Sequence, residues 1–438
     1  MAFVHRQSCE GVKSELDLFT VPPTQNCIIA SHVVEHQPTA SLDSGGPIEF
    51  FIPGSGDDYI DLANTMIHIQ VKVTQPNGAD LDAAAPVGPV NNWLHSLLSQ
   101  VDVFLNGTLV TQSTNTYAYR AFVETLLTYG VGAKSTQLTN QLWYKDKASR
   151  MNAVDLAGGV DPNPGFVTRR EYITGSRVVD MMGRLHVDMF LQDKFLINGV
   201  DVKIRLLRSK PAFALLAGGA APDYKITITN ATLFVKKATL NPAVQLAHIK
   251  ALEKSTVKYP LRPVSVKVYS IPAGARSHTH ENLFLNTLPK RLVLFCIDND
   301  AYNGAYDKNP FHAKNNAINF HSVYVDGRQI PSKPFQPNFE DNLFVRCYTS
   351  LFTSTGKIWQ DEGNGLTRDD YRDGYTFFCF DLTPDQCDGP CFNLVQKGNL
   401  RIEFHFRQAL QQTINVVAYA EFESVLEIDK NRNVIYDY

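Results

Sequence analysis

Hydrophobic and polar residues alternate one by one in several parts of the chain. Between Ile67 and Val73, Ile and Val occupy every second position, with His, Gln and Lys between them. This period of two is typical of a β-strand with one buried face. Similar runs occupy 185–189, 200–206 and 226–235, and turn residues or long loops separate them. The pattern predicts a β-sandwich rather than alternating strands and helices.

A helix pattern interrupts the strands of the first half. The alternation of 101–105 predicts a strand, and Asn106-Gly107 predicts a tight reversal because both central positions of such a turn need φ > 0. The spacing of apolar residues then predicts one helix over 118–129. Asn115 or Thr116 can cap this helix at its start, and Gly130 can end it in the left-handed conformation.

The same arrangement recurs in the second half. A strand at 323–325 leads to the turn Asp326-Gly327, and a second helix pattern runs through Leu343, Cys347 and Leu351 to Gly356. Other echoes follow in the same order. They are Pro53-Gly54 with Pro272-Ala-Gly274, Thr65 with Thr287, Gly199 to Arg208 with Gly398 to Arg407, and Ile226 with Ile414.

These ordered echoes predict an internal duplication. The fold class is therefore expected to be all-β, with two tandem eight-stranded jelly-roll sandwiches (a double jelly roll), each with a short inserted helix. The expected divisions are an N-terminal arm at 1–45, a first jelly roll at 46–245 and a second at 246–438. The segments 131–183 and 356–374 are predicted to be long loops. The alternative is two unrelated sandwiches with similar turns.

Charge and cysteine content narrow the classes of function. Of the 438 residues 19% are charged, the net charge is −3, and no basic arm is present, so wrapping of nucleic acid is not expected. The start lacks an apolar signal segment, and no apolar run reaches the length of a membrane span, so membrane insertion is not expected. The seven cysteines are expected to be reduced thiols of an intracellular protein.

Several short motifs could carry chemistry, and each has a plainer interpretation. His278-Thr-His280-Glu281 resembles part of a cupin metal site, but Glu281 would point away from both histidines on a strand, which favours a solvated loop. Cys387 and Cys391 lack the second pair of a zinc site, and the acidic pairs Asp361-Glu362 and Asp369-Asp370 lie among glycines, as in an exposed loop. No nucleophile elbow or phosphate loop is present. The sequence therefore predicts no catalytic, cofactor-binding or metal-binding residues and no cofactor.

The duplication has a consequence for assembly. Three copies of a chain with two similar sandwiches would form a ring of six, with a pseudo-hexagonal outline that can tile a shell. The predicted role is structural.

Four runs carry a resemblance to a known family. They are Val90-Asn-Asn-Trp-Leu-His-Ser-Leu-Leu-Ser-Gln-Val-Asp-Val, Leu138-Thr-Asn-Gln-Leu-Trp-Tyr-Lys-Asp, Gly183-Arg-Leu-His-Val-Asp-Met-Phe and Phe195-Leu-Ile-Asn-Gly-Val-Asp-Val-Lys-Ile-Arg-Leu. With them the chain resembles the major capsid proteins of Polinton/Maverick elements and adintovirus-like viruses, over about 45–430.

The resemblance implies a double jelly-roll subunit that trimerises and builds an icosahedral shell around double-stranded DNA. Its implied partners are itself, as a homotrimer and in neighbouring capsomers, together with a single jelly-roll penton protein and minor capsid proteins. Sequence-specific nucleic-acid binding is not implied. The implied location is the virion capsid, assembled inside the host cell. The alternative is a two-sandwich glycan-binding or hydrolytic protein, which would need a cleft between the halves with convergent carboxylates or a metal.

Overall fold

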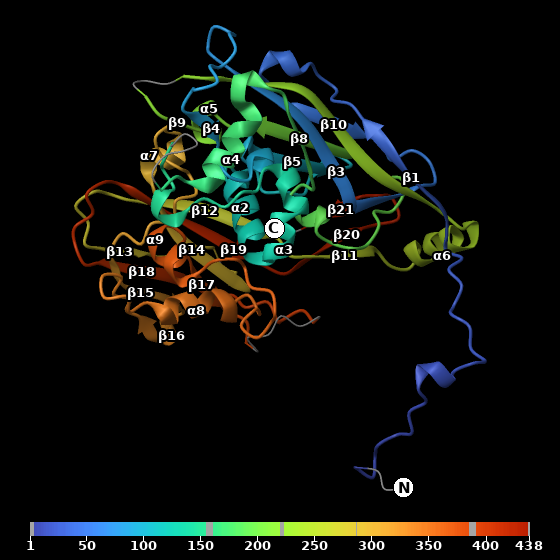
Figure 1. The fold of residues 1–438 in the computed structure, drawn as a ribbon. Helices are drawn as coiled ribbons and strands as arrows, with labels where there is room; N and C mark the ends of the chain where they lie inside the picture. Colours follow the sequence, from blue (N-terminus) through green and yellow to red (C-terminus); the bar gives the residue numbers. More distant parts are fainter. Residues whose placement is uncertain (1–3, 155–160, 220–222, 286, 385–390, 437–438) are drawn as a thin grey trace.

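Two β-sandwiches, one above the other in Figure 1, make up most of the molecule. The computed structural model describes residues 4–154, 161–219, 223–285, 287–384 and 391–436. Within these ranges the strands form six sheets, and four of the six have four strands each. The first half of the chain supplies the upper sandwich and the second half supplies the lower one.

The first sandwich uses eight strands that pair in antiparallel fashion. One sheet has the order β1-β10-β3-β7, and the other has the order β2-β8-β5-β6. The predicted alternation is observed in β3, where Ile67, Ile69, Val71 and Val73 are all fully buried. The bounds are β1 Ile28–His36, β2 Ile48–Ile52, β3 Tyr59–Thr74, β5 Leu98–Leu105, β6 Thr108–Leu109, β7 Val179–Gly183, β8 Val202–Arg208 and β10 Lys225–Leu240.

The second sandwich repeats this topology. Its sheets have the orders β12-β19-β14-β17 and β13-β18-β15-β16. Numbered from one to eight along each half, the strands are ordered 1-8-3-6 and 2-7-4-5 in both sandwiches. The predicted double jelly roll is therefore confirmed. The bounds are β12 Val264–Ile271, β13 Ser277–His280, β14 Arg291–Asp298, β15 Ile318–Val325, β16 Arg328–Phe335, β17 Phe378–Asp381, β18 Leu400–Phe406 and β19 Ile414–Glu421.

Not all of the sequence echoes join equivalent strands. Asn106-Gly107 and Asp326-Gly327 both have φ > 0 and close the hairpins β5–β6 and β15–β16, as predicted. Pro53, in contrast, follows the second strand of its sandwich, whereas Pro272 follows the first strand of the other. That echo is wrong, because Pro-Gly marks the end of many strands and does not identify one.

The N-terminal segment is partly structured. Strand β1 lies inside 1–45, which the sequence assigns to an arm, and pairs with β10 along most of its length. Its outward residues Ile29 and Val33 are apolar but exposed, at 64% and 60%, so the strand shows no clean alternation. The predicted arm therefore extends too far, and only 4–27 precede the first sheet. The predicted boundary between the halves, 245/246, falls inside helix α6, Pro242–Leu252.

Each sandwich carries a helix between its fifth and sixth strands. These are α2 (Tyr117–Thr128) and α8 (Val345–Thr353), close to the predicted positions. Gly130 has φ −77° as the N-cap of the next helix, so the predicted left-handed end of α2 is wrong, whereas Gly356 is left-handed with φ 69°.

The two segments predicted as long loops contain regular structure, so that prediction is wrong. Helices α3 (Val131–Ser135) and α4 (Pro164–Ile173) and strand β7 lie within 131–183, and α9 (Arg368–Asp373) lies within 356–374. The buried residues of α4 include Gly165 and Arg169, so the helix has no apolar stripe for a periodicity search to detect.

The remaining elements connect the sandwiches and cover their ends. They are α1 Trp93–Ser96, α5 Pro211–Ala214, α7 Asn299–Asn303, β4 Val87–Pro89, β9 Leu215–Ala217, β11 Val257–Leu261, β20 Ser424–Ile428 and β21 Val434–Ile435. Among the helices of the described ranges, none is long and apolar enough to cross a membrane. The buried apolar residues of both halves form one continuous core.

Candidate functional site at the junction of the two halves

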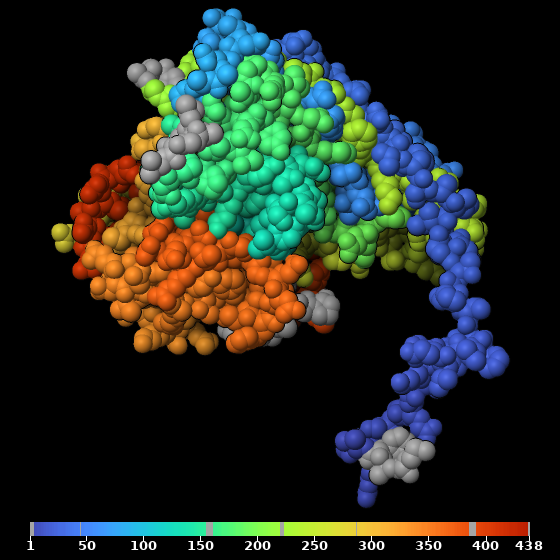
Figure 2. Space-filling view, in the orientation of Figure 1, coloured from blue at the N-terminus to red at the C-terminus, as the bar shows by residue number. Residues whose placement is uncertain are grey.

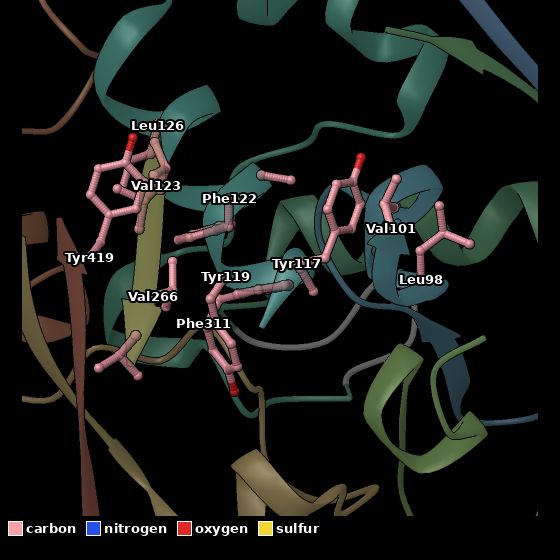
Figure 3. Packing of buried hydrophobic residues seen from close by; sticks show 14 of the residues in the cluster. Leu98, Val101, Tyr117, Tyr119, Phe122, Val123, Leu126, Val266, Phe311 and Tyr419 are labelled. Carbon is pink, nitrogen blue, oxygen red and sulfur yellow. The ribbon is translucent and has the colours of Figure 1, made fainter. Parts of the chain in front are cut away.

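Helix α2 lies at the junction between the two sandwiches. Ten of its twelve residues are buried. A helix that covers a sandwich usually keeps one polar face in water, whereas a helix buried on most sides has protein around it. Here α1 and β5 of the first half pack against α2, and β12 of the second half also contacts it. Figure 3 shows its side chains between Leu98 and Val101 on one side and Val266 and Tyr419 on the other. The helix is thus part of both halves.

An aromatic side chain from the second half completes the apolar part of the junction. The ring of Phe311 stacks on Phe122 of α2, with centroids 4.2 Å apart and planes 7° from parallel. Tyr119, one turn earlier, meets Phe311 edge-on at 5.8 Å (Figure 3) and lies against Tyr302 at 5.9 Å. Aromatic pairs of this kind add about 0.5–1.5 kcal/mol each beyond the area that they bury. The contact therefore holds the two halves in one relative orientation.

A buried network of charges lies beside these rings. Arg120 donates from Nη2 to Asp188 at 2.6 Å and from Nε to Glu124 at 2.8 Å. His186 contacts the other oxygen of Glu124 at 2.6 Å. From the second half, the Tyr419 hydroxyl donates to Glu421 at 3.0 Å and lies 3.5 Å from Glu124.

Burial and pairing set the protonation of the two carboxylates. Burial acts to raise the pKa of Glu124, but Arg120 and the hydrogen bond from His186 outweigh it and lower the pKa to about 2. Burial raises the pKa of Asp188, and Arg120 offsets only part of that rise. Burial also raises the pKa of Tyr419. Glu124 is therefore ionised at neutral pH and fixed to its arginine.

The network borders a cavity of about 700 Å³ between the halves. Glu124, Asp188 and Glu421 all line it, so carboxylates do converge at the junction, which the sequence analysis did not find. Glu124 and Asp188 hold the same guanidinium, and Glu421 pairs with Arg291 at 2.9 Å. A glycosidase needs its two carboxyl groups directed at the bond that breaks. Here each of the three carboxylates is paired with an arginine instead. The arrangement therefore suits a rigid joint between the halves.

A second buried network links the segment 145–169 of the first half to the segment 309–375 of the second half. Asp146 accepts from Arg169 Nη2 at 2.6 Å, and both side chains are almost completely buried, at 1% and 0% exposed. From the second half, Asn309 Nδ2 donates to the other oxygen of Asp146 at 3.0 Å, and the Tyr375 hydroxyl donates to its backbone carbonyl at 3.0 Å. Lys145 forms an ion pair with Asp370 nearby.

A lysine adds one further contact of this kind. Lys134 Nζ donates to the backbone carbonyl of Asn364 at 2.6 Å. Burial lowers the pKa of Lys134 to about 7. Segments more than two hundred residues apart are thus joined by several direct hydrogen bonds.

The histidine motif that resembles part of a cupin site lies elsewhere, on the lower sandwich. His278 and His280 lie in strand β13, so the predicted solvated loop is wrong. Their rings are 6.2 Å apart, and His280 lies against Tyr269 at 3.9 Å. Glu281 pairs with Arg401 at 3.6 Å. Among the described residues no three His, Cys, Asp or Glu side chains come together as metal ligands do.

The other candidate motifs have structural surroundings. Asp369 and Asp370 belong to the first turn of α9, where Asp370 and Thr367 form a capping box, so the predicted exposed loop is wrong there. Asp361 and Glu362 are exposed. Cys391 is an exposed free thiol, and Cys387 lies outside the described residues.

Three of the four runs that carry the family resemblance meet at the junction. Run 90–103 supplies Leu98 and Val101 beside α2, run 138–146 supplies Asp146, and run 183–190 supplies His186 and Asp188. These runs carry the resemblance, but their spacing along the chain does not predict that they lie together in space. One local signal was available. Arg120 and Glu124 are four residues apart within an apolar helix, which is typical of a buried ion pair.

Comparison of sequences gives one extended match. The chain is 26% identical over 431 residues to the uncharacterized protein F54H12.2 of Caenorhabditis elegans, covering 95% of this chain and 99% of that protein. No family model matches the chain.

Comparison of structures identifies the fold. The chain is similar to the Sputnik virophage structure determined by cryo-EM, with a TM-score of 0.67 and 13% identity over 99% of this chain and 94% of that one. It is similar to the Faustovirus major capsid protein, with a TM-score of 0.60 and 11% identity over 97% and 93% of the two chains. A third match, the PBCV-1 virus capsid, has a TM-score of 0.57 and 10% identity over 96% and 100%. These similar structures are double jelly-roll capsid proteins and not enzymes.

Proposed function

We propose that this protein is a major capsid subunit of the Polinton/Maverick and adintovirus-like group. In this proposal the chain forms a homotrimer with a pseudo-hexagonal outline, and the trimers tile an icosahedral shell around double-stranded DNA. The observation that carries the proposal is the repeated strand order, 1-8-3-6 and 2-7-4-5, in both halves. A trimer of such a chain places six nearly equivalent sandwiches around one axis.

The junction supports this role because the subunits of a capsid shell need to be rigid. The Phe311–Phe122 stack, the Arg120 network and the Asp146 network all connect the halves through buried side chains. Buried polar networks that are fully paired hold one arrangement of the elements around them. A subunit whose two sandwiches keep a fixed orientation can present the same edges to every neighbour.

Two observations favour this group of elements in particular. The runs that carry the sequence resemblance also build the junction, which the proposed assembly requires to be rigid. The extended sequence match is to a protein of an animal, the nematode, and it spans nearly all of both chains. An animal relative is what a family of elements carried in host genomes would provide.

The proposal includes partners and a location. The partners are further copies of this chain, a single jelly-roll penton protein and minor capsid proteins. The location is the virion capsid, assembled inside the host cell. No catalysis, cofactor, sequence-specific nucleic-acid binding or membrane insertion belongs to the proposed role.

Light scattering of the purified full-length chain tests the proposed homotrimer. We expect a mass three times that of one chain at micromolar concentration. A stable monomer at that concentration would contradict the proposal.

A further inference from the structure

Residues 4–27, which we call the arm, leave large apolar side chains in water. Leu16, Leu18, Phe19 and Val21 are 68%, 75%, 96% and 86% exposed. The space-filling view shows the arm extending well clear of the body (Figure 2). A single chain therefore gains nothing from these side chains, whereas burying one of them typically contributes about 1.5–3 kcal/mol.

Helix α6, which follows the last strand of the first sandwich, is also apolar and uncovered. Eight of its eleven residues are Pro, Ala, Val, Leu or Ile, and only Leu252 is buried. Leu246 and Ile249 are 52% and 54% exposed. A helix that is apolar on all sides is normally surrounded by protein. The exposed surface of α6 thus lacks a partner within the chain described.

An apolar cavity of about 510 Å³ opens beside this helix. Tyr59, Phe195 and Tyr259 contribute aromatic walls, while Leu240 and Leu252 contribute aliphatic ones. Ligand-sized pockets are typically about 300–1,000 Å³ and mostly apolar, so this cavity has room for a large side chain and its neighbours. Aromatic walls favour an aromatic occupant, because rings pack edge-to-face or offset.

We propose that the arm of a second copy of this chain binds here and places Phe19 in the cavity. This inference deepens the proposed capsid role, on which it rests, by naming a contact between subunits. Charge supports the choice of occupant. Glu15 and Asp17 alternate with Leu16 and Leu18 in the arm, and Lys250, Lys254 and Lys258 are exposed on α6 and the chain that follows it.

The direction of the arm favours another copy as the source of the occupant. The backbone N–H of Asn241, at the start of α6, donates to the Cys27 carbonyl at 2.8 Å, and its side chain donates to the Asn26 carbonyl at 3.2 Å. From this fixed point the chain runs away from its own body (Figure 1). Extended at about 3.3 Å per residue, the eight steps from Cys27 to Phe19 reach about 26 Å from this point.

Photo-crosslinking tests the contact in the full-length chain. A chain with benzoylphenylalanine in place of Phe19 is co-expressed with an unmodified chain that carries a different tag. Oligomers that contain both tags are isolated, irradiated and analysed by mass spectrometry. We expect crosslinks from position 19 to 193–197 or 242–259 of the other chain. Crosslinks within the same chain, crosslinks to another surface, or none at all would overturn the inference.

A matched pair of cavity variants supplies the control. Ala251 lines the cavity and Ala243 does not, although both are exposed alanines of α6. We expect Ala251→Trp to reduce the crosslink yield at least ~10-fold, and Ala243→Trp to leave it within ~2-fold, where tenfold corresponds to about 1.4 kcal/mol. Equal yields from the two variants would contradict the proposal.

An arm variant separates this inference from the proposed function. We expect Phe19→Ser to raise the concentration at which the oligomer dissociates by about 10- to 100-fold, while Val4→Ser leaves it nearly unchanged. A trimer that withstands both changes and gives no crosslink refutes the arm contact and leaves the capsid role standing. A chain that is monomeric at every concentration refutes both.

Discussion

Helices α2 and α8 occupy the same place in the two jelly rolls and differ in what surrounds them. Each lies between the fifth and sixth strands, shortly after a hairpin with two left-handed residues at its tip. Ten of the twelve residues of α2 are buried, but only Cys347, Ser350 and Leu351 of the nine in α8 are. The second helix covers the edge of its own sandwich, where it contacts β17, and the first joins the two sandwiches.

The difference shows how a repeated fold can become a single body. The chain contains two sandwiches of the same strand order, each with an inserted helix in the same place. Helix α2 faces the other sandwich, so its polar side chains need hydrogen-bonding partners inside the protein. Arg120 of α2 has two carboxylates, whereas Arg346 of α8 reaches the backbone carbonyls of Lys333 and Pro334 at the surface. Both arginines are paired, but only one of them is buried.

The largest expected effect follows from this contrast in charge. We expect Arg120→Met to destabilise the protein by about 3–5 kcal/mol, because it leaves Glu124 and Asp188 buried without their cation. Arg346→Met should cost about 1 kcal/mol of stability, since the two backbone carbonyls that it leaves can accept hydrogen bonds from water. Urea unfolding followed by tryptophan fluorescence measures both. Similar losses of stability in the two variants would contradict the proposed difference between α2 and α8.

The next largest effect concerns the apolar contacts. We expect Phe122→Ala to cost about 3–5 kcal/mol, because it opens a cavity opposite Phe311. Phe352 of α8 is half-buried against Tyr348, so Phe352→Ala should cost about 1–2 kcal/mol. The same unfolding experiment ranks the two. A larger loss from the α8 variant would reverse the comparison.

Acid provides a test that separates the two halves. Burial lowers the pKa of His321, which packs against Phe378 and Phe380 of β17, to about 3, and burial lowers the pKa of His95, which contacts Tyr117 of α2, well below 6.5. Each of these histidines stays neutral in the folded protein, whereas the same histidine in the unfolded chain takes up a proton below about pH 6.5. Stability therefore falls as pH drops from 6.5 towards the folded pKa, by up to about 1.4 kcal/mol per pH unit for each histidine.

Hydrogen exchange at several pH values reads out this acid sensitivity for each helix. In the wild type we expect protection of 117–128 and 345–353 to fall between pH 6.5 and 4. In His321→Phe the loss at 345–353 should shrink, and the loss at 117–128 should remain. An unchanged pH profile at 345–353 in the variant would contradict the assignment to His321.

The smallest effect concerns the glycines after the two helices. Gly356 has φ 69°, so Gly356→Ala should cost about 1 kcal/mol in backbone strain. Gly130 has φ −77°, and the three atoms nearest to an added Cβ all belong to the exposed side chain of Glu362, whose carboxylate can move. We therefore expect Gly130→Ala to change stability by less than about 0.5 kcal/mol. Thermal unfolding of the two variants checks the order, and a larger cost at Gly130 would contradict it.

Patterns among neighbouring residues in the sequence predict most of the fold. The alternation at Ile67–Val73 predicted β3, and the turn chemistry of Asn106-Gly107 predicted the first hairpin, because each depends only on neighbouring residues. Strand β1 was missed because Ile29 and Val33 are exposed. Helix α4 was missed because a buried arginine, Arg169, takes the place of an apolar residue in its pattern.

The junction could not be derived from local patterns. Asp146, Arg169 and Asn309 are brought together only by the packing of one half on the other, and no spacing in the sequence connects them. Run 138–146 is one of the four runs that carry the family resemblance, but the resemblance gives no physical reason for Asp146. The reason is physical: a buried carboxylate needs partners, and here they come from distant segments.

Imaging of the purified full-length protein by electron microscopy tests the central claim most directly. The account predicts particles with threefold symmetry and a hexagonal outline, each built from six similar sandwiches, two from every chain. Particles of a single chain, or oligomers without a threefold axis, would contradict it.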